Sequence, residues 1–228
     1  MSKKKKNSNY KGTPDTKGSP TKKNGGKQET SPKTNTKTWI IIAACAAMVL
    51  GLVVGIISTT LAKRSVYVEM DFGEYGTILI EVDKSAAPKT AKNFISLVKS
   101  GFYDGLTIYR AQKNFVIQGG ENKDADLKTI YGEFDSNGHK NPISHQRGVI
   151  SMARSNDPDS ATSIFFITLH NDAAKDLDGK YASFGHVVEG MEVVDAIAGD
   201  LFEHSQDNMG FVKDEHAIKI VSARIVKK

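Results

Sequence analysis

The stretch from Tyr109 to Gly120 brings a cation, an amide and an apolar run together. Its pattern predicts two short strands around a polar turn at 112–114, closed by a glycine pair that can adopt backbone angles other residues avoid. Val116 and Gln118 would share one strand face, with Arg110 on the neighbouring strand. Such a face suits a ligand that is apolar in the middle and carries peptide carbonyls at its rim. Taken alone, the pattern is more often a core strand beside a solvated arginine.

Other kinds of site chemistry find no support in the sequence. The six histidines show no His-x-x-x-His spacing, and Cys45 is the single cysteine, so we expect no metal site and no cofactor. The sequence contains neither a Gly-x-Ser-x-Gly nucleophile motif nor a phosphate loop. An enzyme built on this chain would therefore act by binding and electrostatics rather than by covalent chemistry.

The net charge of +5 averages two opposite regions. Residues 1–38 hold 11 lysines against Asp15 and Glu29, a net charge of +9, whereas residues 65–228 carry a net charge of −6. The basic isoelectric point thus belongs to the N-terminal tail, and we expect no nucleic acid partner for the folded part. The run Lys3–Lys6 either binds anionic lipid or nucleic acid, or only sets membrane topology, and we favour the second interpretation.

The first 62 residues predict a tail and a membrane anchor. Residues 1–38 contain almost no apolar side chains, so we expect a disordered basic cytoplasmic tail. Residues 39–62 begin with Trp39 and carry no charge, which predicts a transmembrane helix across a hydrocarbon core of about 30 Å. The lysine excess before this helix places the N-terminus in the cytoplasm and residues 65–228 outside it. We therefore expect a single-pass protein of the cell membrane.

Three details of this segment carry alternatives. Residues 60–62 resemble a signal-peptide cleavage site, but the apolar run is longer than such peptides use, which favours an uncleaved signal-anchor. Cys45 follows small residues like a lipoprotein cysteine, yet most of the apolar run lies after it, which favours a buried cysteine. Gly51 and Gly55 form a small-xxx-small pair that predicts at most a weak helix–helix dimer.

Residues 65–228 have the pattern of a mainly β domain. A helix of about three turns is expected from Pro88 to a cap at Gly101, and a shorter one at 191–197. The segment 121–146 is long and polar and predicts a loop, and a loop of this length is either functional or an argument against the assignment. Many short strands with two helices suggest a closed antiparallel barrel with helical caps. Eight strands are predicted at 66–72, 77–82, 106–110, 115–118, 149–153, 164–168, 181–188 and 218–226.

Five ordered blocks carry a family resemblance across the whole of this domain. They are Asn93-Phe94 with Gly101-Phe-Tyr-Asp-Gly105, then Tyr109-Arg110 with Phe115-Val-Ile-Gln-Gly-Gly120, Gly148-Val-Ile-Ser-Met-Ala-Arg154, Ser163-Ile-Phe-Phe-Ile167, and Leu177-Asp-Gly-Lys-Tyr-Ala-Ser-Phe-Gly185. Residues 66–226 resemble a cyclophilin, a peptidyl-prolyl cis-trans isomerase, here of a membrane-anchored bacterial type. The resemblance implies an eight-stranded barrel capped by two helices, with a proline pocket on its outer face.

The resemblance also implies roles for individual residues. Arg110 matches the catalytic arginine. The proline pocket would be formed by Phe115, Val116, Phe166 and Leu177. Gln118 and the backbone at Ala153 and Arg154 match groups that hold the peptide, and Tyr181 stands where many members have histidine. The expected partners are proline-containing polypeptides.

Two departures from the family pattern bear on activity. Ile164 replaces a glutamine whose amide would hold the substrate backbone or support Arg110. Asp176 stands where some members have a tryptophan associated with cyclosporin binding, so we expect weak affinity for that drug. The leading hypothesis is an isomerase that assists folding of exported proteins at the outer membrane face. The alternative, motivated by Ile164 and Asp176, is a non-catalytic proline-binding chaperone or scaffold module.

Overall fold

The computed structural model describes the backbone of residues 36–228, and side-chain environments at 39–53 and 65–228. The chain divides into two units, Met1–Val49 and Leu50–Lys228, and each is considered by itself. The predicted disordered tail at 1–38 lies almost wholly outside the described residues.

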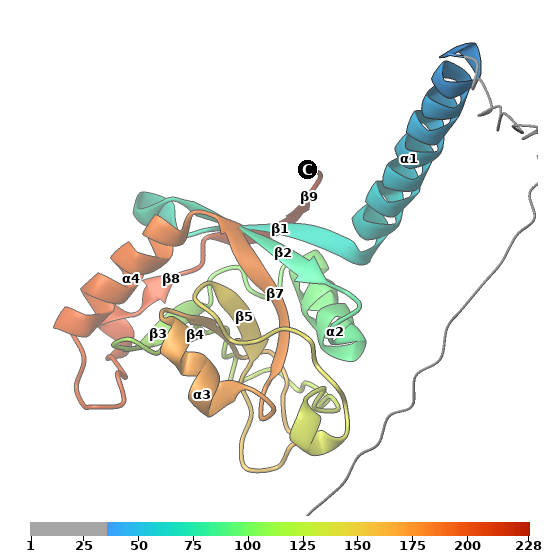
Figure 1. Cartoon of the computed structure of the whole chain (residues 1–228). Coiled ribbons are helices and arrows are strands. Elements are labelled where there is room, and N and C mark those ends of the chain that lie inside the picture. Colours follow the sequence, from blue (N-terminus) through green and yellow to red (C-terminus); the bar gives the residue numbers. More distant parts are fainter. Residues whose placement is uncertain (1–35) are drawn as a thin grey trace, which may run out of the picture. The chain divides into compact units, whose positions relative to one another are not determined.

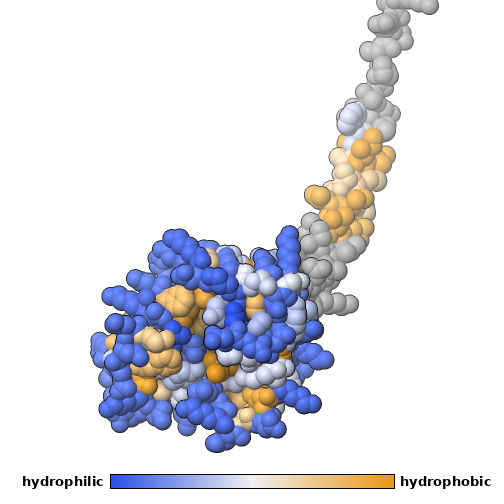
Figure 2. All heavy atoms as spheres, turned by 90° about the horizontal axis from the view of Figure 1, so that it is seen from below, coloured by the Kyte–Doolittle hydropathy of each residue, from blue (hydrophilic) through white to orange (hydrophobic). Residues whose placement is uncertain are grey.

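Helix α1 (Thr36–Arg64) covers the segment predicted to span a membrane. Its described side chains are exposed, with Trp39 and Leu50 among the large apolar ones (Figure 2). Within the part of the chain that the structure describes, no helix meets the length and apolar character needed to cross a bilayer. The membrane role of this segment therefore stays a prediction.

The second unit is built on one sheet of nine strands (Figure 1). Their spatial order is β8-β3-β4-β6-β5-β7-β2-β1-β9, and every recorded pairing is antiparallel. The strands are β1 (Ser65–Asp71), β2 (Thr77–Asp83), β3 (Thr107–Gln112), β4 (Val116–Gly119), β5 (Val149–Met152), β6 (Phe165–Thr168), β7 (Ala182–Glu189), β8 (Ile218–Lys219) and β9 (Ser222–Val226).

The predicted closed barrel of eight strands is wrong in two respects, because the sheet has nine strands and is open. The single last strand expected at 218–226 divides into β8, which pairs with β3, and β9, which pairs with β1. Between them the amide of Ile220 donates to Leu106 O and that of Val221 to Asp71 O. The chain thus changes partner within two residues, and β8 and β9 end the sheet without pairing with each other.

Helices α2 (Pro88–Lys99) and α4 (Met191–Glu203) confirm the two predicted helices. The former packs on β7 and β9 and the latter on β2 and β3 (Figure 1). Gly101, with φ +71°, ends the first helix as predicted. The second runs six residues beyond the predicted 197, because its buried positions continue to Leu201 at helical spacing. A short helix, α3 (Ala174–Leu177), was not predicted, and 3₁₀ turns occur at Gly73–Tyr75, Asp135–Asn137, Asn171–Ala173 and Asp214–His216.

Alternation along the strands divides their side chains between a main core and an outer face. Ile117, Phe165 and Ile167 belong to the main core, whereas Val116 and Phe166 belong to a separate apolar cluster. Neighbouring positions therefore face opposite sides, as the period of two requires. The sheet thus carries a second, smaller apolar surface outside its core.

Candidate active site

Arg110 reaches the outer face because strand β3 contains a bulge. Ile108 and Ala111 both lie in the main core, three positions apart, which a regular strand would not allow. The register with β4 shifts between Ile108 and Arg110, and Arg110 then pairs directly with Gln118. The irregularity thus places the guanidinium beside the amide, as the sequence predicted.

Three acceptors hold the Arg110 guanidinium in place. Its Nη1 donates to Gln118 Oε1 at 2.9 Å, its Nη2 to Gln112 Oε1 at 2.7 Å and its Nε to Met209 O at 2.8 Å. The group also lies 5.3 Å over the ring of Phe211. An arginine has five N–H donors, so one on each terminal nitrogen remains free of these bonds. Burial lowers the pKa of Arg110, but an arginine stays charged at any working pH.

Gln118 is itself oriented by Tyr109. Its Nε2 donates to the Tyr109 hydroxyl at 2.9 Å, which turns Oε1 toward the arginine. Burial raises the pKa of Tyr109, so the phenol stays neutral at physiological pH. The amide predicted to hold the substrate therefore supports Arg110 in this structure, and one N–H of Gln118 remains for a ligand.

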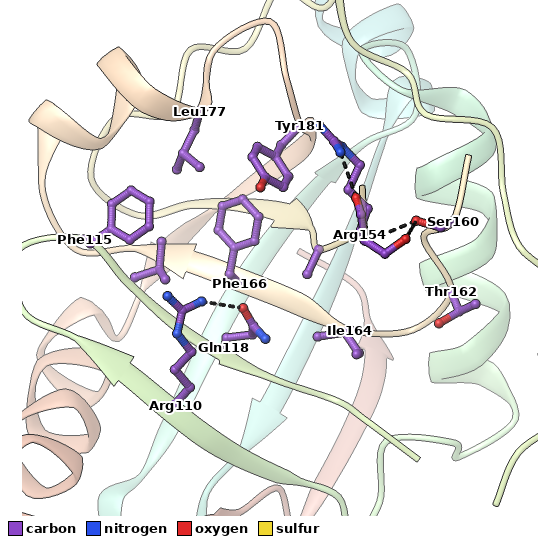
Figure 3. Close-up of a pocket in the computed structure, with 13 residues that line it drawn as sticks. Arg110, Phe115, Gln118, Arg154, Ser160, Thr162, Ile164, Phe166, Leu177 and Tyr181 are labelled. Atoms are coloured by element: carbon purple, nitrogen blue, oxygen red, sulfur yellow. Dashed lines mark hydrogen bonds between the residues drawn. The ribbon is translucent and has the colours of Figure 1, made fainter. Parts of the chain in front are cut away.

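An apolar cup lies beside this polar group. It is the separate cluster of Val116, Phe166, Ala173 and Leu177, with Phe115 and Tyr181 packed against it. The rings of Phe166 and Tyr181 meet edge to face, with centroids 5.6 Å apart. Figure 3 shows Phe115, Phe166 and Leu177 on the same side of the pocket as the Arg110 head group.

All nine predicted site residues line one open pocket of about 500 Å³. They are Arg110, Phe115, Val116, Gln118, Ala153, Arg154, Phe166, Leu177 and Tyr181. The remaining lining residues are Ser155, Ser160, Thr162 and Ile164, so the position that departs from the family pattern forms part of the wall. The structure brings the predicted residues together, and their individual roles in binding and catalysis stay predictions.

Several residues around the site were not anticipated. Gln112 shares its strand face with Arg110 two positions away, a spacing that the sequence displays. Met209 and His145 come from distant segments, and no local pattern indicated them. His145 is buried and stacks on Phe166 at 5.9 Å between ring centroids. Within the described residues, no group of three or more His, Cys, Asp or Glu side chains could hold a metal ion.

The His145 ring bonds on both sides. Its Nδ1 lies 2.7 Å from Asp178 Oδ1 and its Nε2 lies 3.0 Å from Ser151 Oγ. Burial lowers the pKa of His145, and the Asp178 carboxylate opposes this shift without reversing it. A neutral ring meets both contacts if Nδ1–H donates to the carboxylate and Nε2 accepts from the serine. His145 therefore supports the floor of the cup as an uncharged group.

Comparison with known proteins decides the family. The model of the cyclophilin-type peptidyl-prolyl cis-trans isomerases matches residues 67–225. This chain belongs to that family. The chain is 37% identical over 182 residues to a peptidyl-prolyl cis-trans isomerase of Acinetobacter baylyi, covering 78% of this chain and 94% of the relative. It is 38% identical over 158 residues to peptidyl-prolyl cis-trans isomerase A of Dickeya dadantii, covering 67% and 81%. The chain is thus an isomerase of peptidyl-prolyl bonds.

Solved cyclophilins share this fold. A Cryptosporidium parvum cyclophilin-type isomerase, crystallised in the presence of the dipeptide Ala-Pro, is 26% identical with a TM-score of 0.58. The comparison covers 71% of this chain and 99% of the crystallised one. The crystallised isomerase therefore matches this chain over nearly its whole length.

Proposed function

We propose that this cyclophilin binds proline-containing polypeptides in the Arg110 pocket and assists the folding of exported proteins at the outer face of a bacterial membrane. One observation carries the catalytic part of the proposal. The Arg110 guanidinium is fixed by three acceptors and lies in the same pocket as an apolar cup. A positioned cation beside a proline-sized apolar surface is what electrostatic catalysis of this rotation needs.

The mechanism rests on differential binding of the twisted bond. Rotation about a peptide bond meets a barrier of about 18–20 kcal/mol because the nitrogen lone pair is delocalised. At the twisted state the lone pair returns to the prolyl nitrogen, where a free N–H of Arg110 can donate to it. The planar isomers offer no such acceptor, so this donation lowers the barrier in both directions. The cup holds the ring while the preceding residue turns.

The test measures exchange between the isomers of an Ala-Pro peptide by NMR, with the full-length chain. We expect wild-type protein to accelerate exchange and Arg110→Ala to lose about 100-fold to 1,000-fold of kcat/KM. Arg110→Lys keeps the charge without the fork and should recover only part of this loss. Equal rates for wild-type protein and Arg110→Ala would exclude this role for the arginine.

Ile164 motivates a second candidate, a binding module that holds proline peptides without turning them. The side chain lines the pocket and offers no amide to the substrate backbone. Titration separates the two functions, because a binding module would shift peptide resonances while leaving isomer exchange at its uncatalysed rate. We favour the catalytic function, because the Arg110 donor is retained.

We also propose a single-pass topology, with residues 39–62 in the membrane, the tail in the cytoplasm and the cyclophilin domain outside. Self-association through Gly51 and Gly55 would be weak. The test replaces Cys45 by Ala and adds a cysteine at Ser8 or at the exposed Lys128. A membrane-impermeant maleimide should label the Lys128 position in intact bacteria and the Ser8 position only after lysis. The reverse pattern would contradict this orientation.

A further inference from the structure

The pocket extends beyond the proline cup to a second cation, Arg154. In Figure 3 the Arg154 side chain lies at the end of the pocket away from Phe115 and Leu177. Its guanidinium carbon is 4.8 Å from the Tyr181 ring centroid and 5.0 Å from that of Phe134. Two backbone bonds hold it, from Nε to Lys180 O at 3.0 Å and from Nη1 to Ser155 O at 2.8 Å. The side chain is therefore fixed by groups that leave its charge uncompensated.

No carboxylate neutralises this arginine among the residues that the structure describes. None lies within 4.0 Å of its nitrogens, and its Nη2 has no hydrogen-bond partner there. The nearby carboxylates have other donors: Asp159 Oδ1 accepts from Gly132 N and Asn137 Nδ2, and Asp157 Oδ1 accepts from Asp159 N. A half-buried cation with a free donor is a receptor for an anion.

The surroundings of Arg154 suit an aliphatic side chain that ends in a charge. The wall of the same pocket includes Ala153 and Ile164, which are apolar and half-buried. Ile164 thus removes a polar group from this wall, which favours methylene groups over polar backbone contacts. Ser155 and Ser160 also line the pocket, and the Ser155 hydroxyl donates to Ser160 Oγ at 2.8 Å.

The separation between Arg154 and the apolar cup is one that neighbouring residues of a single bound peptide can span. Tyr181 contacts both ends, 5.6 Å from the Phe166 centroid and 4.8 Å from the arginine carbon. Extended peptide rises about 3.3 Å per residue, so a side chain one or two positions from the proline spans this separation. A pocket of about 500 Å³ has room for both groups.

We propose that Arg154 forms a subsite for a carboxylate, so that this isomerase prefers substrates with glutamate or aspartate one or two residues before the proline. The inference rests on the proposed function of the same pocket and names its substrate class. The selectivity is specific to the pocket, since the domain at 65–228 has a net charge of −6 and would otherwise repel acidic segments.

The test compares peptides within one enzyme. Ala-Xaa-Ala-Pro-Phe and Ala-Ala-Xaa-Pro-Phe, with Xaa as Glu, Gln or Lys, are assayed with the full-length chain by NMR exchange. We expect kcat/KM for the better Glu peptide to exceed that of its Gln isostere roughly threefold to tenfold, and Lys to rank last. The Glu/Gln ratio should fall to about one in Arg154→Gln and recover in part in Arg154→Lys.

A matched charge control separates local from general electrostatics. Lys128→Gln removes one positive charge from an exposed site that does not line the pocket, and its Glu/Gln ratio should equal that of wild-type protein. A wild-type ratio of one, or a ratio that survives in Arg154→Gln, would overturn the inference. Absence of catalysis on every peptide would instead count against the proposed function, and the ratio of peptide dissociation constants would then decide the subsite.

Discussion

At the residue scale, the proposed catalytic group is an assembly around one side chain. Arg110 is bonded to Gln112, Gln118 and the backbone of Met209, and Gln118 is bonded in turn to Tyr109. A long flexible side chain loses rotamer freedom when it is ordered, and these fixed acceptors supply that order before the substrate arrives. The remaining N–H donors of Arg110 are then held in a fixed orientation. Loss of any one of the three acceptors should therefore reduce turnover more than it reduces peptide affinity.

Removing the Gln112 acceptor tests this view. Gln112→Ala leaves Nη2 without its 2.7 Å bond, so we expect kcat for an Ala-Pro peptide to fall about threefold to tenfold with little change in KM. Gln146→Ala is a suitable comparison, because that exposed amide donates only to Ser144 Oγ and does not line the pocket. An equal change in KM and kcat, or no change, would indicate that Gln112 does not position the arginine.

Ile164 offers the complementary substitution. It lines the pocket outside both apolar clusters, so a polar side chain there would not enter the core. Ile164→Gln should raise kcat/KM for a neutral Ala-Pro peptide about twofold to tenfold, the value of one added hydrogen bond. Ile164→Leu keeps an apolar side chain and should leave kcat/KM near the wild-type value. A decrease in Ile164→Gln would show that the apolar wall itself promotes turnover.

At the element scale, the segment after α4 holds Arg110 in position through a backbone carbonyl. Asp207 Oδ1 accepts the amides of Met209 at 2.9 Å and Phe211 at 3.4 Å, which shapes the turn that presents Met209 O to Arg110. Gly210 within it has φ +83°, and its carbonyl accepts the Ala111 amide at 2.8 Å. This turn therefore couples the end of β3 to a segment about one hundred residues away in sequence.

Gly210→Ala should break that support. An added Cβ would lie 2.0 Å from Ala111 O, and the positive φ disfavours any L side chain. We expect the free energy of unfolding to fall by about 1–3 kcal/mol and kcat to fall with it. Gly199→Ala, in the exposed part of α4 with no atom near the new Cβ, should instead stabilise by about 0.5–1 kcal/mol. Urea denaturation and peptide exchange measure both, and similar stability of the two variants would contradict the strain.

Local patterns and long-range contacts explain which elements the sequence could predict. The strands carrying Arg110, Gln118 and Phe166 follow from alternation, and α2 follows from Pro88, its apolar spacing and Gly101. The division of the last strand into β8 and β9 does not follow from a local pattern, since the amides of Ile220 and Val221 donate to acceptors on two distant segments. The end of α4 was predicted at 197, six residues too early, although the buried face continues to Leu201 at helical spacing.

At the scale of the whole molecule, opposite charges separate along the chain. The tail carries +9 and the domain at 65–228 carries −6, while the pocket of this acidic domain contains two arginines. The sequence made the charge division visible, and the family resemblance named the pocket residues. Neither could place His145 behind Phe166, because that contact joins two segments through the fold and carries no local pattern.

His145 makes the stability of the whole molecule depend on pH. Its pKa is lowered by burial in the folded state, whereas an unfolded histidine titrates near 6.5. Below about pH 6.5 the histidine is therefore protonated in the unfolded chain but still neutral in the folded one. The free energy of unfolding then decreases as the pH falls from about 6.5 toward the pKa of His145 in the folded state. Burial raises the pKa of Asp178, but hydrogen bonds from Ser144 and His145 outweigh it and lower the pKa overall. The stabilisation that Asp178 contributes is present above about pH 3.8 and is lost only below that pH. Asp178 and His145 therefore change the free energy of unfolding in two different pH ranges.

Urea denaturation of the full-length chain between pH 8 and pH 5 resolves this dependence, with free energy of unfolding as the readout. We expect a decline below about pH 6.5 in wild-type protein. His145→Gln should be less stable throughout, since it disturbs buried bonds to Asp178 and Ser151, yet its decline should be shallower. His170→Gln alters an exposed ring and should keep the wild-type slope. If His145→Gln also kept the wild-type dependence of the free energy of unfolding on pH, the acid sensitivity would have to come from another group. The titration of the His145 ring beside Phe166 would then not explain it.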